Sequence, residues 1–398
     1  MRISLRFGLA YLLLLSPLAM AQEVPLGLSK TKSEGRCVKT PSGYMVPYKQ
    51  RIPGTRVEFE MVPIPGGKFQ LGSPKIEAGR KLDEGPQVAV EVEPFWMGKF
   101  EVTLAEYRVY MECYQIFKAD QSKRRGPLTL EEMIDAVTSP TPLYEPDIVY
   151  QFGAADNEPA AFMSHYAARQ YSKWISLLTR NTYRLPTEIE WEYAARAGSK
   201  SAYFFGDDPK ELGRYAWFFD NSKEEYHPVG MKLPNPWGLY DIYGNVAEFT
   251  LNWYDADAYA KLKPGRQRPG AIVWPEKRYN EVVRGGSWDS TAKDLRSAAR
   301  NKTDPEWIEA DPHLPRSAWW FTEEEAACVG LRLLRPLRTP RRSTLETQWG
   351  GGPLAQDAHD SETNGRGVYG VVDRTLASEL RKQRGIKELK KRRESKEP

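Results

Sequence analysis

Three cysteines and four histidines are the side chains of this sequence best suited to nucleophilic or metal chemistry. They are Cys37, Cys113, Cys328, His165, His227, His313 and His359. Three cysteines cannot all pair with one another, and their spacing fits no metal motif. Cys113 lies within a predicted helix and Cys328 directly precedes an apolar strand, which is typical of buried thiols. A disulfide between Cys37 and one of the other two remains an alternative.

The histidines do not favour an iron site, which needs two or three of them around open coordination positions. His227 lies in a predicted turn, His165 begins a predicted helix, and His359 lies in the polar C-terminal region. Such separate settings indicate structural or surface histidines.

Residues 284–292, RGGSWDSTA, combine charged, hydroxyl and aromatic side chains. The two adjacent glycines permit a tight backbone turn, and Arg284 can pair with a buried carboxylate. Trp288 is expected in the core. The segment predicts a turn that stabilises the fold, with Arg296 and Arg300 in the same network, rather than a catalytic centre.

Periodicity and capping residues predict the elements that position these side chains. Alternation over residues 57–72, around a Pro-Gly-Gly turn, predicts a β-hairpin. Capping boxes at Thr103 and Thr187, and a cap at Ser164, predict three helices. Helices come early and irregular strands late, and the chain has 31 Gly and 30 Pro. The predicted class is therefore α+β and loop-rich.

The N-terminal region predicts export. Residues 1–21 combine two arginines, a short apolar stretch and Ala19-Met20-Ala21, a small-x-small cleavage site, as in a signal peptide. An uncleaved anchor is the alternative. We therefore expect a periplasmic or extracellular protein. Residues 22–55 are expected to form an extended N-terminal arm, and no later segment is apolar enough to span a bilayer.

The remaining boundaries follow from composition. Residues 56–337 form the predicted domain, with an insertion at about 118–157 that contains one short helix. Residues 338–398 predict a disordered linker and basic tail, because apolar anchors are few. From residue 379 onward there are nine Lys or Arg and four Glu. The tail is expected to contact anionic surfaces, whereas the slightly acidic body is not expected to bind nucleic acid.

Six segments, in order, resemble the sulfatase-modifying factor family, which includes the formylglycine-generating enzymes. They are MVPIPGGKFQLGS (61–73), DEGPQVAVEVEPFWMGKFEVTLAEY (83–107), YRLPTEIEWEYAARAG (183–198), HPVGMKLPNPWGLYDIYGNVAEFT (227–250), VVRGGSWDSTAKDLRSAAR (282–300) and VGLRLLRP (329–336). The resemblance implies one α+β domain related to the C-type lectin fold, with little regular secondary structure.

The resemblance also implies where oxidase chemistry would lie. The family's oxidases hold copper on two cysteines that follow the RGGS segment, because thiolates select Cu(I). Here Ser290 and Ala292 stand near those positions, and a hydroxyl and a methyl group cannot bind Cu(I). Ser287 matches a residue that lines the oxidase groove. The sequence is identified as a divergent member without the cysteine pair, so neither copper nor iron is expected.

The family resemblance further implies a structural calcium site in residues 241–248. Asp241 and Glu248 would supply carboxylate oxygens, and Gly244 and Val246 main-chain carbonyls, which are ligands that Ca²⁺ prefers. A metal-free turn is the alternative. Ala247 replaces the usual family tryptophan, which further weakens the oxidase interpretation.

Trp319, Trp320 and Phe321 form a run of aromatics outside any helical period. They could form an exposed ledge that binds sugar or peptide, or they could be buried. The favoured function is therefore a non-oxidase binding or scaffold protein with a peptide or glycan ligand. The alternative is a divergent metal-dependent oxidase of the formylglycine-generating or iron-dependent sulfoxide synthase type.

Overall fold

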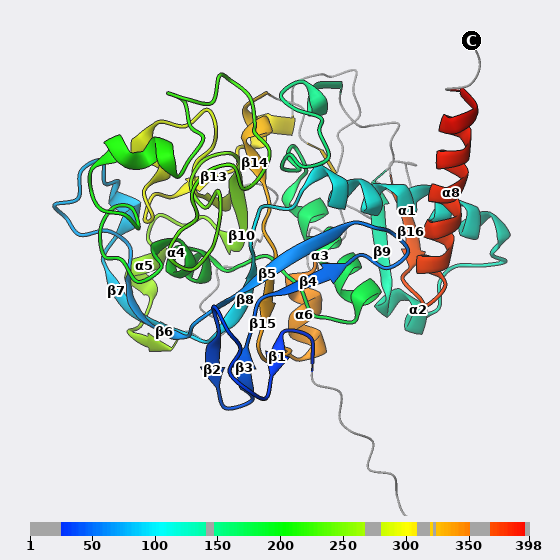
Figure 1. The fold of residues 1–398 in the computed structure, drawn as a ribbon, viewed down its shortest axis with the longest axis horizontal. Coiled ribbons are helices and arrows are strands. Elements are labelled where there is room, and N and C mark those ends of the chain that lie inside the picture. Colours follow the sequence, from blue (N-terminus) through cyan, green and yellow to red (C-terminus); the bar gives the residue numbers. More distant parts are fainter. Residues whose placement is uncertain are drawn as a thin grey trace, which may run out of the picture.

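The computed structural model describes residues 25–140, 147–266, 280–308, 319–320, 324–350 and 367–394. The strands are β1 (Leu28–Ser29), β2 (Val38–Thr40), β3 (Gly43–Met45), β4 (Tyr48–Arg51), β5 (Glu58–Ile64), β6 (Gly67–Leu71), β7 (Val88–Val92), β8 (Phe95–Gly98), β9 (Ala136–Pro140), β10 (Ala247–Trp253), β11 (Gly265–Arg266), β12 (Glu281–Arg284), β13 (Asn301–Lys302), β14 (Val329–Gly330), β15 (Leu334–Pro336) and β16 (Gly367–Val371). The α-helices are α1 (Leu104–Lys123), α2 (Leu130–Ile134), α3 (His165–Thr179), α4 (Glu188–Arg196), α5 (Ala258–Lys261), α6 (Arg342–Gln348) and α8 (Leu376–Glu394). Short helices and strands joined by long loops confirm the α+β, loop-rich prediction (Figure 1).

An antiparallel sheet in the order β15-β8-β5-β4 runs through the middle of the molecule (Figure 1). The hairpin predicted over residues 57–72 is wrong, because β5 and β6 do not pair. β5 pairs with β4 and β8, whereas β6 pairs with β7 in a separate sheet with β11. Both strands show the alternation of a hairpin, but sequence alternation fixes which face is buried and not which strand is the partner.

A second four-stranded sheet, β13-β12-β10-β14, contains or adjoins the segments that carry the candidate functional residues. β10 lies antiparallel to β12, with Glu248 opposite Arg284, and parallel to β14, with Glu248 opposite Gly330. Three segments far apart in the sequence therefore meet along β10: the loop before it, the turn that follows β12, and the segment containing β14.

The predicted helix starts are correct. Thr103 and Thr187 form capping boxes with Glu106 and Glu190, and the Ser164 side chain accepts a hydrogen bond from the Ala167 amide. These caps satisfy amides that have no partner inside the helix. The short helix expected in the insertion is α2, and α1 continues to Lys123, beyond the end expected from the sequence.

The chain ends are more structured than predicted. The proposed N-terminal arm contains β1 to β4, and its Met45 and Ile52 are fully buried. In the proposed disordered tail, β16 pairs with β9 of the insertion, and α8 packs along α1 (Figure 1). Leu376 and Leu380 of α8 are buried. A few apolar residues suffice because β9 of the insertion offers a strand edge and α1 offers a helix face to receive them.

No helix within the described ranges is both long and apolar enough to cross a bilayer. The predicted signal peptide, residues 1–21, lies outside the described residues.

Candidate functional site

The turn after β12 is held by ion pairs under the surface. Arg284, 1% exposed, donates to Glu188 Oε1 and Glu192 Oε2 of α4, each at 2.7 Å. Arg300 Nε also donates to Glu188 Oε1, at 2.6 Å. Burial alone would raise the pKa of Glu188, but Arg300 and Arg284 lower it below its usual value. Arg284 therefore pairs with buried carboxylates, as the sequence predicts.

The expected network is divided in two. Arg296 binds Glu84, with Nη2 2.6 Å from Oε1, and also Glu77, rather than the carboxylates of α4. Gly286 has φ +66°, and a Cβ there would lie 2.7 Å from Leu295 Cδ1, so the turn requires glycine at this position.

The two oxidase positions lie next to this turn and offer no metal ligand of the required kind. Ser290 Oγ accepts a hydrogen bond from the Ser287 amide at 3.0 Å, and its hydroxyl lies 3.1 Å from Ser287 Oγ. Ala292 contributes its carbonyl, which accepts from the Tyr203 hydroxyl at 2.7 Å. Ser287 is only 3% exposed, so its hydroxyl is mainly engaged in holding the loop.

The cysteines lie elsewhere, and none of the three forms a disulfide. Cys113 is fully buried in α1, where burial raises the pKa of its thiol far above the usual value. Cys37 precedes β2, Cys328 precedes β14, and both are half-buried. A disulfide with Cys37, left open from the sequence, does not form in this structure, and Cys113 has the character of a core residue.

The two histidines of the described residues, His165 and His227, also lie in separate settings, whereas His313 and His359 lie outside the described residues. His165 is buried, with Nε2 2.8 Å from the Thr250 carbonyl oxygen. Burial, together with the charge of Arg169, lowers the pKa of His165 to about 3, so its ring is neutral. The His227 ring stacks on Trp217 with centroids 3.7 Å apart. Within the described ranges, no three His, Cys, Asp or Glu side chains form a group that could hold a metal ion.

The loop before β10 belongs to a buried acidic cluster, which we define as Glu101, Asp241 and Glu248 with Arg332. All four residues are at most 1% exposed. Arg332 Nε donates to Glu248 Oε1 at 2.7 Å, and Trp191 Nε1 donates to Glu248 Oε2 at 2.7 Å.

The other two carboxylates of the cluster hold the backbone of the loop. Glu101 Oε1 accepts from the Val246 amide at 3.0 Å, and Asp241 Oδ2 accepts from the Gly230 amide at 2.6 Å. Asp241 Oδ1 has no hydrogen-bond partner.

Protonation relieves part of the negative charge of this cluster. Burial and the charge of Asp241 raise the pKa of Glu101 well above its usual range. Burial also raises the pKa of Asp241 to about 6. One guanidinium therefore faces three carboxyl groups, of which two titrate high.

As placed, these residues do not fit the predicted calcium site. Both oxygens of Glu248 already accept hydrogen bonds, and Arg332 supplies positive charge beside them. Gly244, with φ +75°, is packed so that a Cβ would lie 2.0 Å from the Trp217 carbonyl oxygen. Calcium binding through Asp241, Gly244, Val246 and Glu248 stays a prediction, and it would require Glu248 to leave Arg332.

Sequence reasoning missed Glu101 and Arg332. Each lies inside a largely apolar segment, in KFEVTL and VGLRLL. A charged residue within a buried strand pattern needs a partner. The position of each charge inside an apolar segment is therefore the sequence signal that indicates a buried ion pair.

Of the two alternatives for the aromatic run, an exposed ledge or burial, burial holds for its first two members. Trp319 and Trp320 are 0% and 1% exposed, and they pack on Tyr166 and Tyr107, with centroids 5.3 and 5.8 Å apart. The α1 and α3 helices supply enough tyrosine surface to cover both indoles. Phe321 lies outside the described residues.

Comparisons with known proteins agree with this architecture. The family model of the "Sulfatase-modifying factor enzyme 1-like domain" matches residues 50–311. The serine/threonine-protein kinase pkn1 of Chlamydia pneumoniae is 32% identical over 265 residues, which cover 66% of this chain and 38% of the kinase. The chain thus spans less than two fifths of that relative.

Two further relatives are covered almost completely. The formylglycine-generating enzyme of Thermomonospora curvata is 28% identical over 62% of this chain and 89% of that enzyme. The solved structure of PvdO from Pseudomonas aeruginosa superposes with a TM-score of 0.51 and 26% identity, covering 72% of this chain and 100% of that one. This chain therefore belongs to the family of sulfatase-modifying factor enzyme 1-like domains.

Proposed function

We propose that this chain is a non-oxidase member of its family, exported from the cytoplasm, whose domain binds a peptide or glycan ligand. The observation that carries the proposal is the pair of positions after the RGGS turn. Ser290 and Ala292 offer a hydroxyl group and a methyl group, whereas Cu(I) chemistry needs two thiolates close together.

The surroundings of these positions support the same conclusion. The hydroxyl of Ser290 lies within hydrogen-bonding distance of Ser287, and no base of the described residues bonds to it. His165 is buried at the start of α3 with its ring bonded to a main-chain carbonyl. An activated nucleophile needs a base within hydrogen-bond reach, so these hydroxyls have the environment of loop-stabilising groups.

The test is a search for aldehyde formation. The purified chain is incubated with Cu(I), oxygen and a Cys-x-Pro-x-Arg peptide, and the peptide is analysed by mass spectrometry. We expect no aldehyde above a control with metal and no protein. The Thermomonospora curvata enzyme serves as the positive control, and turnover by this chain would overturn the proposal.

A further inference from the structure

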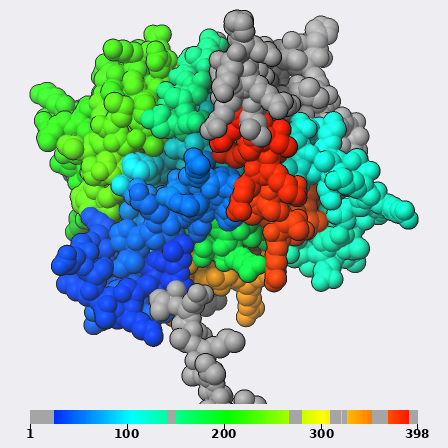
Figure 2. Space-filling model, turned by 45° about the vertical axis from the view of Figure 1, so that its right-hand side comes forward, coloured from blue at the N-terminus to red at the C-terminus, as the bar shows by residue number. Residues whose placement is uncertain are grey.

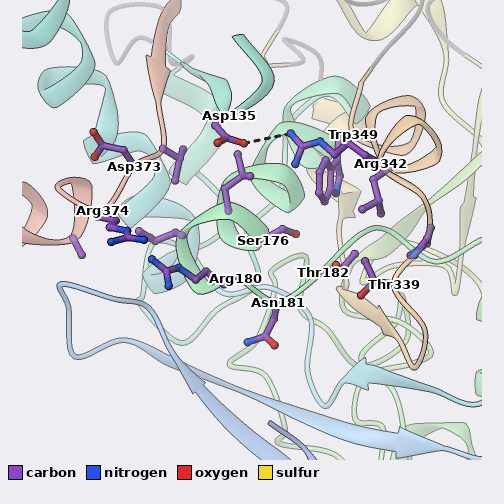
Figure 3. A pocket seen from close by; sticks show the side chains of 16 residues that line it. Asp135, Ser176, Arg180, Asn181, Thr182, Thr339, Arg342, Trp349, Asp373 and Arg374 are labelled. Carbon is purple, nitrogen blue, oxygen red and sulfur yellow. Dashed lines mark hydrogen bonds and ion pairs between the residues drawn. The ribbon is translucent and has the colours of Figure 1, made fainter. Parts of the chain in front are cut away.

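A cavity of about 880 Å³ lies where the C-terminal elements meet the end of α3 (Figure 3). One wall is formed by the last turn of α3 and the residues that follow it, 176–182. Asp135 and residues 339–349 and 372–377 complete the lining, and the last two ranges lie beyond the end of the family match at residue 311. The volume lies within the range of ligand pockets, and one wall is an addition of this chain to the family domain.

Two arginines give the cavity an excess of positive charge. Arg180 and Arg374 are exposed, and no carboxylate of the described residues pairs with either side chain. Arg342 is already engaged, with Nε 2.9 Å from Glu346 Oε1 and Nη2 3.5 Å from Asp135 Oδ1. Figure 3 shows Arg180 and Arg374 on one side of the cavity and Thr182 and Thr339 on the other.

The carboxylate of Asp373, which also lines the cavity, is engaged in hydrogen bonds within its own segment. Asp373 Oδ1 accepts hydrogen bonds from the amide and the hydroxyl of Thr375, each at 2.7 Å, just before α8 begins. These bonds between residues two positions apart hold the carboxylate in the turn that precedes the helix. The groups left to meet a ligand are therefore two guanidinium groups, which bind carboxylates in a bidentate manner.

The apolar part of the lining is aliphatic. Leu177, Leu178 and Pro340 are half-buried around the cavity. Trp349 also lines it but is only 3% exposed, and the Arg342 guanidinium lies 5.4 Å from its ring centroid. The indole face that a sugar ring would stack on is thus covered, whereas the aliphatic surface suits peptide side chains.

We propose that this cavity binds an acidic peptide segment with aliphatic side chains, its carboxylates held by Arg180 and Arg374 and its apolar side chains resting on Leu177, Leu178 and Pro340. The inference rests on the proposed binding function and names its ligand class. The cavity uses neither Ser287 nor Ser290. The peptide-binding proposal can therefore be wrong while the non-oxidase proposal holds, and the non-oxidase proposal can be wrong while the cavity still binds peptide.

The experiment measures binding of a fluorescent peptide of alternating leucine and glutamate to the full chain by anisotropy. The pocket variants are Arg180→Gln, Arg374→Gln and the double variant. Arg381→Gln is the matched control, because Arg381 is an exposed arginine of α8 that does not line the cavity. Each single pocket variant should weaken binding about tenfold, the effect of one lost charge-assisted bond. The double variant should weaken it about a hundredfold, and added salt should weaken it further.

Three comparisons can overturn the proposal. The proposal is wrong if a peptide with glutamine in place of glutamate binds as tightly as the leucine-glutamate peptide. It is also wrong if the Arg381→Gln variant loses as much affinity as the pocket variants, or if oligogalacturonate competes better than the unlabelled peptide. Absence of any peptide binding would also overturn it. Unchanged melting temperatures of all the variants establish that a loss of affinity comes from the pocket and not from unfolding.

Discussion

At the scale of single residues, the acidic cluster is a feature whose burial costs free energy unless its charges are paired. Glu101, Asp241 and Glu248 are buried with one cation, Arg332. Buried charges are stable only when they are paired and hydrogen-bonded. Arg332 fills this role and also donates to the Gly98 and Tyr240 carbonyls at 3.0 and 2.9 Å, so it joins β8 to the loop before β10.

Removing Arg332 should destabilise the protein strongly. Arg332→Met leaves the Glu248 carboxylate without its cation, a change that typically costs about 3–5 kcal/mol of unfolding free energy. Equilibrium unfolding in urea measures the loss, and Arg338→Met, at an exposed arginine, is the control. Adding Glu248→Gln to Arg332→Met should recover part of the loss. A cost below 1 kcal/mol for Arg332→Met would contradict this account of the cluster.

The cluster should also give stability a defined pH dependence. The pKa of Asp241 is raised by burial to about 6, above its value of about 3.9 in an unfolded chain. Its contribution to stability is therefore present below about pH 4 and is lost as the pH rises through 6. Asp241→Asn should be more stable than the wild type at pH 7, by roughly 2–3 kcal/mol, and similar to it at pH 4.

Urea unfolding at several pH values measures this difference. The exposed Asp220 supplies the matched control, Asp220→Asn, which should follow the wild type throughout. A constant difference between Asp241→Asn and the wild type across this range would show that Asp241 does not titrate in it.

Calcium removal tests the ligand assignment of the same loop. Arg332 and Trp191 bind the Glu248 carboxylate in this structure, so the same melting temperature in calcium and in chelator would rule out the predicted calcium site. Bound calcium would instead add about 2.7 kcal/mol at 100 times its dissociation constant. A chelator-sensitive wild type and an insensitive Glu248→Gln variant would establish the calcium site and show that Glu248 exchanges Arg332 for the ion.

At the scale of elements, the C-terminal strand and helix are attached by specific contacts. β16 pairs with β9 over five residue pairs, and a Cβ at Gly370 would lie 1.9 Å from Phe117 Cδ1 of α1. α8 continues this attachment beside α1, as the red ribbon of Figure 1 shows. In Figure 2, where this side of the molecule comes forward, the red C-terminal residues lie next to the cyan ones. The C-terminal segment is thus part of the folded core around α1.

Two aliphatic residues of α8, one buried and one exposed, should reveal this attachment. Leu380 is fully buried, whereas Ile386, 56% exposed, lies on the same helix. Leu380→Ala should cost about 2–5 kcal/mol, the usual cost of a buried leucine, and Ile386→Ala should cost less than about 0.5 kcal/mol. Thermal and urea unfolding measure both. Equal, small effects would show that α8 is not docked in solution.

At the scale of the whole molecule, positive charge is concentrated at the C-terminal end. The formal net charge is +4, yet residues 379–398 carry nine Lys or Arg and four Glu. On α8, Arg384 and Lys387 pair with Glu112 of α1 at 2.8 and 3.0 Å, so part of this charge serves docking. The charges after residue 388 are the ones to test for contact with an anionic surface.

This charge separation predicts salt-sensitive binding to anionic vesicles. Each basic residue near such a surface contributes about 1 kcal/mol, and salt screens the attraction. The full chain should sediment with vesicles that contain phosphatidylserine at low salt and less at high salt. A chain ending at residue 388 should bind weakly under both conditions. Equal binding to neutral vesicles would show that charge is not responsible.

The sequence alone determined the local features and the family. Capping residues Thr103, Ser164 and Thr187 set the helix starts because the capping bond joins residues three positions apart. The ordered motifs were enough to identify the domain, and Ser290 and Ala292 showed the missing thiolates, because ligand type is a property of the residue itself.

Only the tertiary structure decided the pairings between distant segments. β5 and β6 separate into different sheets, Trp319 and Trp320 are buried against tyrosines, and Glu248 meets Arg332, 84 residues away. The C-terminal segment, too polar to fold alone, gains order from β9 and α1. Burial and partner choice depend on surfaces that exist only after folding, so local composition could not specify them.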